Sequence, residues 1–490
     1  MSIAALRLTM PKQNLHISRD TTAMYRDVLV NQVLSVADFG GHFDKVLENL
    51  HNLNRMPLDG DVRFNLTEAL INQFLVFVQQ VRAGDLVLTN RQRSELPDIN
   101  REFAYAAKLL LRDAVPHSKE EMANFVYWAI SAMVEQLQDF SEQHRSQPGL
   151  LWAEVNRLYL FAESRFLTDF HSNQPDNRDI ESRYKQALLF QAAQPEHLND
   201  EEQRLIEGYL RKWAFRGQLN RQENREFNSH YFYIDLESTC GAQSSKEIQG
   251  SAKDDSVRVL NPLPIIEQTR QHMQQLRNGT AAEKIGFPTK SDNIDAFMAL
   301  KKALVAWKQA SSRRFERAPC SIEARTALGL TTIYSYLRSP QSVLDNLIVS
   351  HTVNSSKTGA CVKITNLLKD KELVAVGDVV MHHQNSESKG RLGLVRWLKR
   401  AGESIVFGLE FIIGNLQPVT FRARDSVAEA LLISTSDNDS LITHKGSCAT
   451  NTPVRLKSSR HGISLNARAQ SLIQRGQHVD QIRLKRNQVE

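Results

Sequence analysis

Hydrophobic residues in this chain recur with two different periods, and the change between them divides the sequence. From about Thr21 to Gly217 they recur every three or four residues, the spacing of amphipathic helices that pack on one another. From Ala360 onward they occur in short alternating runs separated by turn residues, a pattern typical of β-strands. We therefore expect an α+β multidomain protein in which an all-α region, a bundle or an irregular solenoid, precedes a β-rich region.

Two capping boxes support the helical prediction. Ser118 is followed by Glu121, and Asn199 by Glu202, so each first side chain can accept a bond from the backbone N–H of the second. In the run after Ser118, aromatic residues such as Phe125 recur at helical spacing, and we interpret them as packing residues.

Between the two regions the pattern is mixed. It predicts one strand and two helices, at Tyr231–Leu236, Pro262–Asn278 and Asn293–Ala310. The polar stretch from Gly241 to Ser256 predicts a loop. It lacks the Gly-Lys-Ser/Thr ending of a phosphate-binding loop, which argues against a nucleotide hydrolase.

Two short polar motifs stand at the start of the β-rich region. Arg313-x-x-x-Arg317 precedes a proline, and Asn354-x-Ser356-x-x-Gly359 lies further on. Each is weak alone, because basic clusters are usually solvated and Asn, Ser and Gly are common in turns. Their chemistry nevertheless suits a guanine nucleotide. An arginine fork can pair with a phosphate or with guanine O6 and N7, Asn and Ser can serve a base edge, and Gly lets backbone approach a flat ligand.

In this order, and followed by a β pattern, the motifs resemble those of the PilZ family of cyclic di-GMP receptors. In that family an Arg-x-x-x-Arg segment lies ahead of the first strand of a small β-barrel, and Asp/Asn-x-Ser-x-x-Gly sits in the next strands. The resemblance extends over the last third of the chain to Gly377-Asp378, Val395-Arg-Trp397 and Gly408-x-x-Phe411. It implies that the following residues bind cyclic di-GMP: Arg313, Arg314, Arg317, Asn354, Ser356 and Gly359.

The resemblance also suggests a division of the chain. We expect a helical domain at 1–225, a mixed linker region with a connecting helix at 226–310, a PilZ-like small β-barrel at 311–425 and a basic β extension at 426–490. The segment Ser321–Thr352, between the two motifs, is long for the family. Within it, Ile333–Pro340 looks like an insertion that would shape or obstruct the ligand entrance.

Composition limits the class of protein. Hydrophobic residues make up 41% and charged residues 24%, as in an ordinary globular protein. No stretch approaches the ~20 apolar residues of a membrane span, and the N-terminus lacks a signal-peptide pattern, so we expect a cytoplasmic protein. The four cysteines lie far apart and predict neither a disulfide framework nor a zinc site. A net charge of +6 permits an anionic partner without identifying it.

No catalytic motif is present. The sequence contains neither His-Glu-x-x-His nor Gly-x-Ser-x-Gly. His382 and His383 are adjacent, so on a strand their side chains would point to opposite faces, and we interpret the pair as part of a polar loop. We expect no enzymatic activity, no metal and no cofactor besides the ligand cyclic di-GMP.

The function implied is that of a bacterial second-messenger receptor. We expect the barrel to bind cyclic di-GMP and the helical domain to pass the signal to an unidentified protein partner, with biofilm formation or motility as outputs. One alternative is a degenerate PilZ-like adaptor that binds no nucleotide. Another is a nucleic-acid-binding protein that uses the basic C-terminal extension. We expect that extension to be a solvated strand face, because few aromatic residues are interleaved for base stacking.

Overall fold

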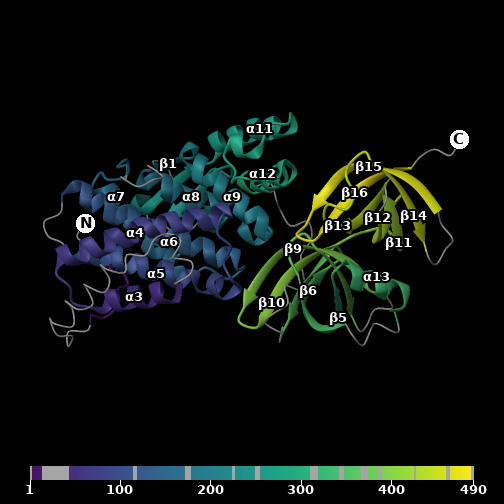
Figure 1. Cartoon of the computed structure of the whole chain (residues 1–490), viewed down its shortest axis with the longest axis horizontal. Coiled ribbons are helices and arrows are strands. Elements are labelled where there is room, and N and C mark those ends of the chain that lie inside the picture. Colours follow the sequence, from purple (N-terminus) through teal and green to yellow (C-terminus); the bar gives the residue numbers. More distant parts are fainter. Residues whose placement is uncertain are drawn as a thin grey trace. The chain divides into compact units, whose positions relative to one another are not determined.

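The computed structural model describes most of the chain and divides it into two compact units. The described residues are 3–13, 43–113, 118–171, 178–222, 227–248, 254–309, 318–340, 347–365, 374–384, 389–423, 426–436, 438–458 and 464–486. The first unit comprises Met1–Gln143, Gln147–Gln194 and Arg204–Ala310. The second comprises His144–Ser146, Pro195–Gln203 and Ser311–Glu490. A helical region followed by a β-rich region is confirmed (Figure 1).

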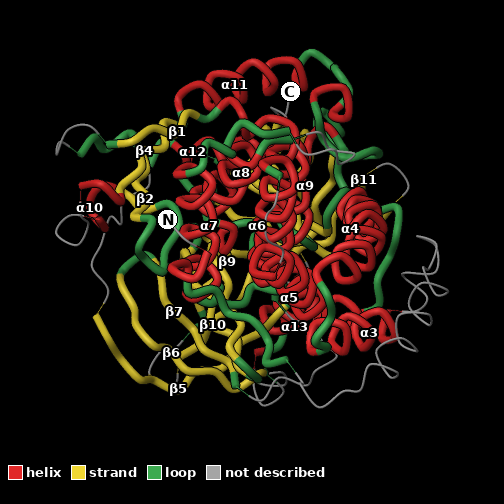
Figure 2. The backbone as a smooth tube through the Cα atoms, turned by 90° about the vertical axis from the view of Figure 1, so that its left-hand side faces the viewer, coloured by secondary structure: helices red, strands yellow, loops and turns green. Residues whose placement is uncertain are grey.

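The N-terminal region is made of helices. They are η1 (Ile3–Leu6), α3 (Phe43–Arg55), α4 (Gly60–Ala83), α5 (Asn90–Asp113), α6 (Lys119–Glu142), α7 (Gly149–Ser164), α8 (Ile180–Ala192), η2 (Pro195–His197), α9 (Asp200–Trp213) and η3 (Ala214–Arg216). Figure 2 looks nearly along the axes of α4, α5 and α6, which lie side by side. No helix among the described residues combines the length and the apolar character that a membrane crossing requires.

Helix α6 is the core element of the first unit and packs against α5, α7 and α8. Its predicted capping box is confirmed: Ser118 Oγ accepts from Glu121 N at 3.1 Å, and Glu121 Oε2 accepts from Ser118 N at 3.2 Å. Phe125 and Trp128 are buried packing residues, as their spacing predicts. The second capping box, at the start of α9, is also confirmed by reciprocal bonds of 2.9 Å between Asn199 and Glu202.

The segment predicted as a linker, 226–310, instead belongs to the first unit. Its strands β2 (Phe232–Asp235), β3 (Gln243–Ser244) and β4 (Val257–Asn261) join β1 (Gln218–Arg221) in an antiparallel sheet of order β1-β4-β2-β3. The helical elements are α10 (Ser245–Ile248), η4 (Asp254–Ser256), α11 (Leu263–Arg277), η5 (Ala282–Ile285) and α12 (Asn293–Trp307). Trp307 is fully buried and donates from Nε1 to Leu189 O of α8 at 2.9 Å, which attaches α12 to the helical core.

The second unit contains a closed six-stranded barrel, called the first barrel below. Its strands are β5 (Ala318–Leu328), β6 (Ile348–Ser356), β7 (Gly359–Ile364), β8 (Val379–Gln384), β9 (Arg391–Ala401) and β10 (Ser404–Phe411). They pair antiparallel in the order β10-β7-β6-β5-β8-β9, and β9 pairs with β10 to close the barrel. Inward-facing apolar residues such as Val362, Val380 and Phe407 fill its interior.

The predicted β extension is in fact a second closed barrel. Its strands are β11 (Asn415–Ala423), β12 (Ser426–Ser434), β13 (Asp439–His444), β14 (Pro453–Ser458), β15 (Ser464–Arg475) and β16 (Val479–Arg486), in the order β11-β12-β13-β16-β15-β14. A boundary at 425 would separate β11 from β12, its direct partner. Phe421, Leu441 and Ile482 belong to its own apolar interior, so this barrel does not depend on the first barrel for a core.

The two barrels share an apolar cluster on their outer surfaces. Helix α13 (Leu330–Arg338), which the sequence presents as an insertion, supplies Ile333 and Tyr336 to this cluster. Met381 of the first barrel and Leu431 of the second also contribute. The inserted segment therefore packs on the outer face of β5 and β8, where it helps to join the barrels.

A second contact between the barrels joins two loops at a pair of glycines, Gly377 and Gly476. A Cβ added to Gly377 would lie 2.6 Å from the Cα of Gly476. Beside this glycine pair, Asp378 accepts from the backbone N of His478 at 3.0 Å and lies 2.8 Å from His478 Nδ1. The close backbone approach explains why glycine is needed at both positions.

Candidate functional site

Three of the six predicted ligand-binding residues lie on one hairpin of the first barrel. Asn354 and Ser356 are in β6, and Gly359 begins β7 after a two-residue turn. Ser356 pairs with Gly359, and Ser356 Oγ donates to Gly359 O at 3.3 Å. Asn354 and Ser356 are half-buried. The hairpin therefore presents small polar groups at one end of the barrel, called the motif end below.

The arginine segment precedes the strand that pairs with this hairpin. Arg313, Arg314 and Arg317 lie outside the described residues. The strand that follows them in sequence, β5, starts at Ala318, which pairs with Ser355, and Pro319 pairs with Asn354. The described residues that directly follow the arginine motif in sequence therefore pair with the strand that carries Asn354 and Ser356.

Two β-bulges occur beside Asn354. On β6, Thr352 pairs with Val362 but Asn354 pairs with Cys361, so β6 carries one extra residue. On β5, the register with β6 shifts between Pro319 and Ile322. Bulges bend a strand and redirect its side chains, and they are common beside binding sites. Here they separate fully buried Thr352 from half-buried Asn354.

An arginine that motif reasoning missed also lies at the motif end. Arg391 begins β9, and its Nη2 donates to Lys357 O in the β6–β7 turn at 2.8 Å. Its Cζ lies 3.5 Å from the ring centroid of Phe411, the last residue of β10. Phe411 N in turn donates to Thr358 O at 2.8 Å. The only sequence signal for Arg391 was its position in a basic cluster.

Beneath the motif end, the barrel interior is polar. His382 Nε2 lies 2.9 Å from Thr352 Oγ1, and its Nδ1 lies 3.4 Å from Thr326 Oγ1. Thr326 Oγ1 lies 2.6 Å from Ser350 Oγ, and Gln384 Nε2 donates to Thr352 Oγ1 at 3.2 Å. The hydroxyls and the imidazole are fully buried, so this network holds β5, β6 and β8 together by satisfied hydrogen bonds.

His382 is neutral in this environment. Burial lowers the pKa of His382 to about 4, and Arg391 and His383 act in the same direction. His383 lies on the other face of β8, with Nδ1 3.3 Å from Tyr336 Oη. The opposite orientation of the two rings is confirmed, but their prediction as loop residues was wrong, because both belong to β8. Among the described residues, no cluster of three or more His, Cys, Asp or Glu could hold a metal ion.

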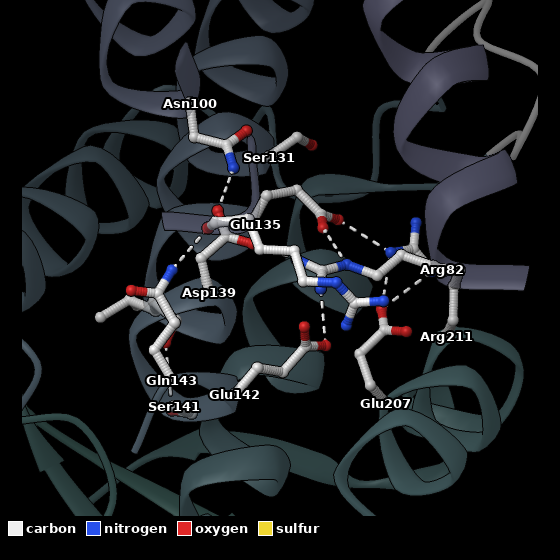
Figure 3. Close-up of polar contacts among 12 residues, drawn as sticks. Arg82, Asn100, Ser131, Glu135, Asp139, Ser141, Glu142, Gln143, Glu207 and Arg211 are labelled. Carbon is white, nitrogen blue, oxygen red and sulfur yellow. Dashed lines mark hydrogen bonds and ion pairs between the residues drawn. The ribbon is translucent and has the colours of Figure 1, made fainter. Parts of the chain in front are cut away.

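A second polar cluster lies inside the first unit (Figure 3). Arg82 of α4 bonds three carboxylates of α6: Nε to Glu135 at 3.0 Å, Nη2 to Asp139 at 2.7 Å and Nη1 to Glu142 at 2.6 Å. Arg211 of α9 bonds Glu135 at 2.8 Å as well. The other charged members are Arg183 of α8, which bonds Glu135, and Glu207 of α9, which bonds Arg211.

This cluster, with three arginines and four carboxylates, has one negative charge in excess if every group is ionised. Burial would raise the pKa of Glu135, but Arg211, Arg183 and Arg82 hold it well below its ordinary value. Burial raises the pKa of Asp139 to about 7. Arg82 opposes this shift, whereas the neighbouring carboxylates Glu142 and Glu135 add to it. Below about pH 7 Asp139 therefore carries a proton that balances the charge of the cluster. The members of the cluster connect helices α4, α6, α8 and α9.

The fold and the site together define a class: a helical unit followed by a pair of six-stranded antiparallel barrels, the first with a polar hairpin at one end. Residues 27–223 match the family described as the N-terminal domain of the cyclic-di-GMP receptor FimW. The match covers less than half of the 490 residues and falls in the helical region.

Other comparisons add little. No curated protein matches this chain. A crystal structure of the Borreliella burgdorferi PlzA protein in complex with c-di-GMP is similar over 35% of this chain and 88% of that chain. The sequence identity is 10% and the TM-score 0.14, too low to support an argument about the fold.

Proposed function

We propose that this chain is a receptor for cyclic di-GMP and that the motif end of the first barrel binds the nucleotide. The observation that carries the proposal is the β6–β7 hairpin, which brings together Asn354, Ser356 and Gly359 and pairs with the first residues of β5. The match of the helical region to the N-terminal domain of a cyclic-di-GMP receptor supports the same function independently.

Each residue has a role in this proposal. Arg313, Arg314 and Arg317 pair with the phosphates and with guanine O6 and N7. Asn354 and Ser356 bond a guanine edge, and Gly359 lets the hairpin backbone approach the base. Five of these positions match the PilZ-family motifs.

Arg391 supplies a further guanidinium to the proposed site. Its bond to Lys357 O and its stacking on Phe411 hold the group against the hairpin turn. A guanidinium positioned in this way loses less conformational entropy when it pairs with an anion or a base edge. The neutral His382 network supports the same strands from inside the barrel.

The proposal includes no chemical reaction. Binding biases an interaction between the receptor and a protein partner that contacts the helical unit. A cytoplasmic location and an output in biofilm formation or motility follow from the PilZ resemblance and belong to this proposal.

The proposal is tested by measuring cyclic di-GMP affinity of the full chain and of Asn354→Ala. Loss of one guanine-edge contact weakens binding by about tenfold or more, from the roughly 1–3 kcal/mol of such a contact. Asn466→Ala is the matched control, because this exposed asparagine lies on β15 of the second barrel. Equal affinity of Asn354→Ala and the wild type would remove the hairpin from the site.

A further inference from the structure

The outer surface of the second barrel carries exposed cations on four neighbouring strands. β11, β14, β15 and β16 are consecutive in the barrel and are labelled in Figure 1. Their outward positions form a surface called the basic face below, with six exposed cations: Arg422, Arg455, Lys457, Arg468, Arg483 and Lys485. A seventh exposed cation, Arg486 at the end of β16, is ion-paired to Asp439 of β13 and is not counted. In the sequence these residues are scattered over more than sixty positions, and barrel closure brings them to one surface.

Like charges on this face stand directly opposite one another. Arg422 pairs across strands with Arg455, and Arg468 pairs with Lys485. Directly opposed like charges destabilise an antiparallel pair. The four strands contain one carboxylate, Asp480, which is buried and accepts bonds from Arg475 at 3.0 and 3.1 Å. The strands themselves therefore do not neutralise the basic face, and an anionic partner would relieve its repulsion.

The side chains on the face distinguish between kinds of polyanion. Protein interfaces contain an apolar core, and surfaces that enter a membrane carry apolar anchors. Among the described residues of β14, β15 and β16, no large apolar side chain is strongly exposed. Phe421, the one aromatic residue of the four strands, is fully buried, so unpaired bases would find no stacking platform. Apart from Val427 of β12, which is exposed opposite Arg422, the face consists of cations and polar side chains. Such a surface matches the phosphate backbone of a duplex, whose protein interfaces are polar and strongly positive.

We propose that the basic face binds the phosphate backbone of duplex nucleic acid, without base-specific contacts. Six cations can neutralise at most six phosphates. The logarithm of the binding constant should then fall with the logarithm of the salt concentration with a slope of about −5. Between 50 and 200 mM salt the affinity should drop by about a thousandfold. This activity is independent of the motif end, which belongs to the first barrel.

The test measures binding of the full chain to a fluorescein-labelled 20-base-pair DNA duplex by fluorescence anisotropy, at salt concentrations from 50 to 200 mM. The variant Arg455→Gln/Arg468→Gln removes one cation from each like-charge pair and should reduce the slope by about 2. Lys284→Gln/Lys301→Gln is the matched control, since it removes two exposed cations from the first unit and changes the net charge equally. Thermal unfolding of the free Arg455→Gln variant should occur at or above the wild-type midpoint, because a repulsion is relieved.

Duplex binding with the steep slope, weakened in the face variant and unchanged in the control, would support the proposal. Three results would overturn it: no duplex binding at 50 mM salt, equal salt slopes for wild type and face variant, or binding to phosphatidylserine vesicles without binding to the duplex. Loss of cyclic di-GMP binding has no bearing on these outcomes.

Discussion

Replacing Asp139 by asparagine should abolish a pH dependence of the stability of the first unit. Because burial raises the pKa of Asp139 from 3.8 to about 7, the folded protein binds a proton that the unfolded chain releases above pH ~4. The stability that this bound proton contributes is therefore fully present below pH ~4. It is lost as the pH rises through about 7. Integrated from pH 5 to pH 8, the loss is about 2.6 kcal/mol.

Asparagine retains the shape of the neutral carboxyl group. Its Oδ1 can still accept from Arg82, and its amide faces Asn100, which donates to Asp139 in the wild type (Figure 3). The Asn100 side-chain amide must then turn over, so that its Oδ1, which meets no donor among the described residues, accepts from the new amide. Asp139→Asn should thus keep the packing of α4, α5 and α6 while removing the titrating group.

The assay is urea unfolding at pH 5, 6, 7 and 8, followed by tryptophan fluorescence. Four of the five tryptophans, Trp128, Trp152, Trp213 and Trp307, belong to the first unit, so the signal reports mainly on its unfolding. The control is Asp61→Asn, an exposed carboxylate at the start of α4.

The informative quantity is the difference between wild type and variant. Burial lowers the pKa of His272, so this residue adds stability as the pH rises over part of the same window. The depressed pKa of Glu135 makes its contribution complete above pH ~5 and constant over the window. If wild type and Asp139→Asn lose equal stability from pH 5 to pH 8, Asp139 is ionised throughout and the charge-balance reasoning is wrong.

Two further predictions concern the second unit. Gly377→Ala should destabilise it by roughly 2–4 kcal/mol, because φ is +87° and the new Cβ would lie 2.6 Å from Gly476 Cα; an unchanged thermal midpoint would contradict this. Arg391→Ala should weaken cyclic di-GMP binding about tenfold or more, whereas Arg396→Ala, on the same strand but ion-paired to Glu410, should bind like the wild type. Equal effects of both arginine variants on calorimetric affinity would show only a general charge effect.

Local features of the fold could be predicted from the sequence. The Ser118 and Asn199 capping boxes mark real helix starts, and the buried aromatic residue Phe125 follows the predicted helical period. The alternating pattern after Ala360 also corresponds to real strands, such as β15 and β16, which pair with each other. These features depend on residues close together in the sequence, where capping and alternation act directly.

Barrel closure could not be predicted in the same way. Only Ile412–Gly414 separates β10 from β11, and the pattern of short strands continues across this turn. Nothing in the local sequence shows that β10 completes the first barrel and that β11 begins the second. The basic face depends on the same closure, because Arg422 and Arg455 become neighbours only through the pairing of β11 with β14.

The buried polar groups could not be predicted either, because their partners are distant in the sequence. Ser350 and Thr352 occupy inward positions of β6, where alternation alone predicts apolar residues, and their partner His382 comes from β8. In the first unit, Glu135 and Asp139 are four residues apart and read as an ordinary solvated helix face. Only the packing of Arg82 and Arg211 against them identifies a buried cluster.

The central claim, that this chain is a cyclic di-GMP receptor, is tested most directly by calorimetric titration of the full chain with cyclic di-GMP and with GTP as a control ligand. Arg313→Ala and Arg317→Ala are titrated beside the wild type. The account predicts micromolar or tighter binding of cyclic di-GMP, lost in both variants and absent for GTP. No heat and no thermal shift at saturating cyclic di-GMP would contradict it.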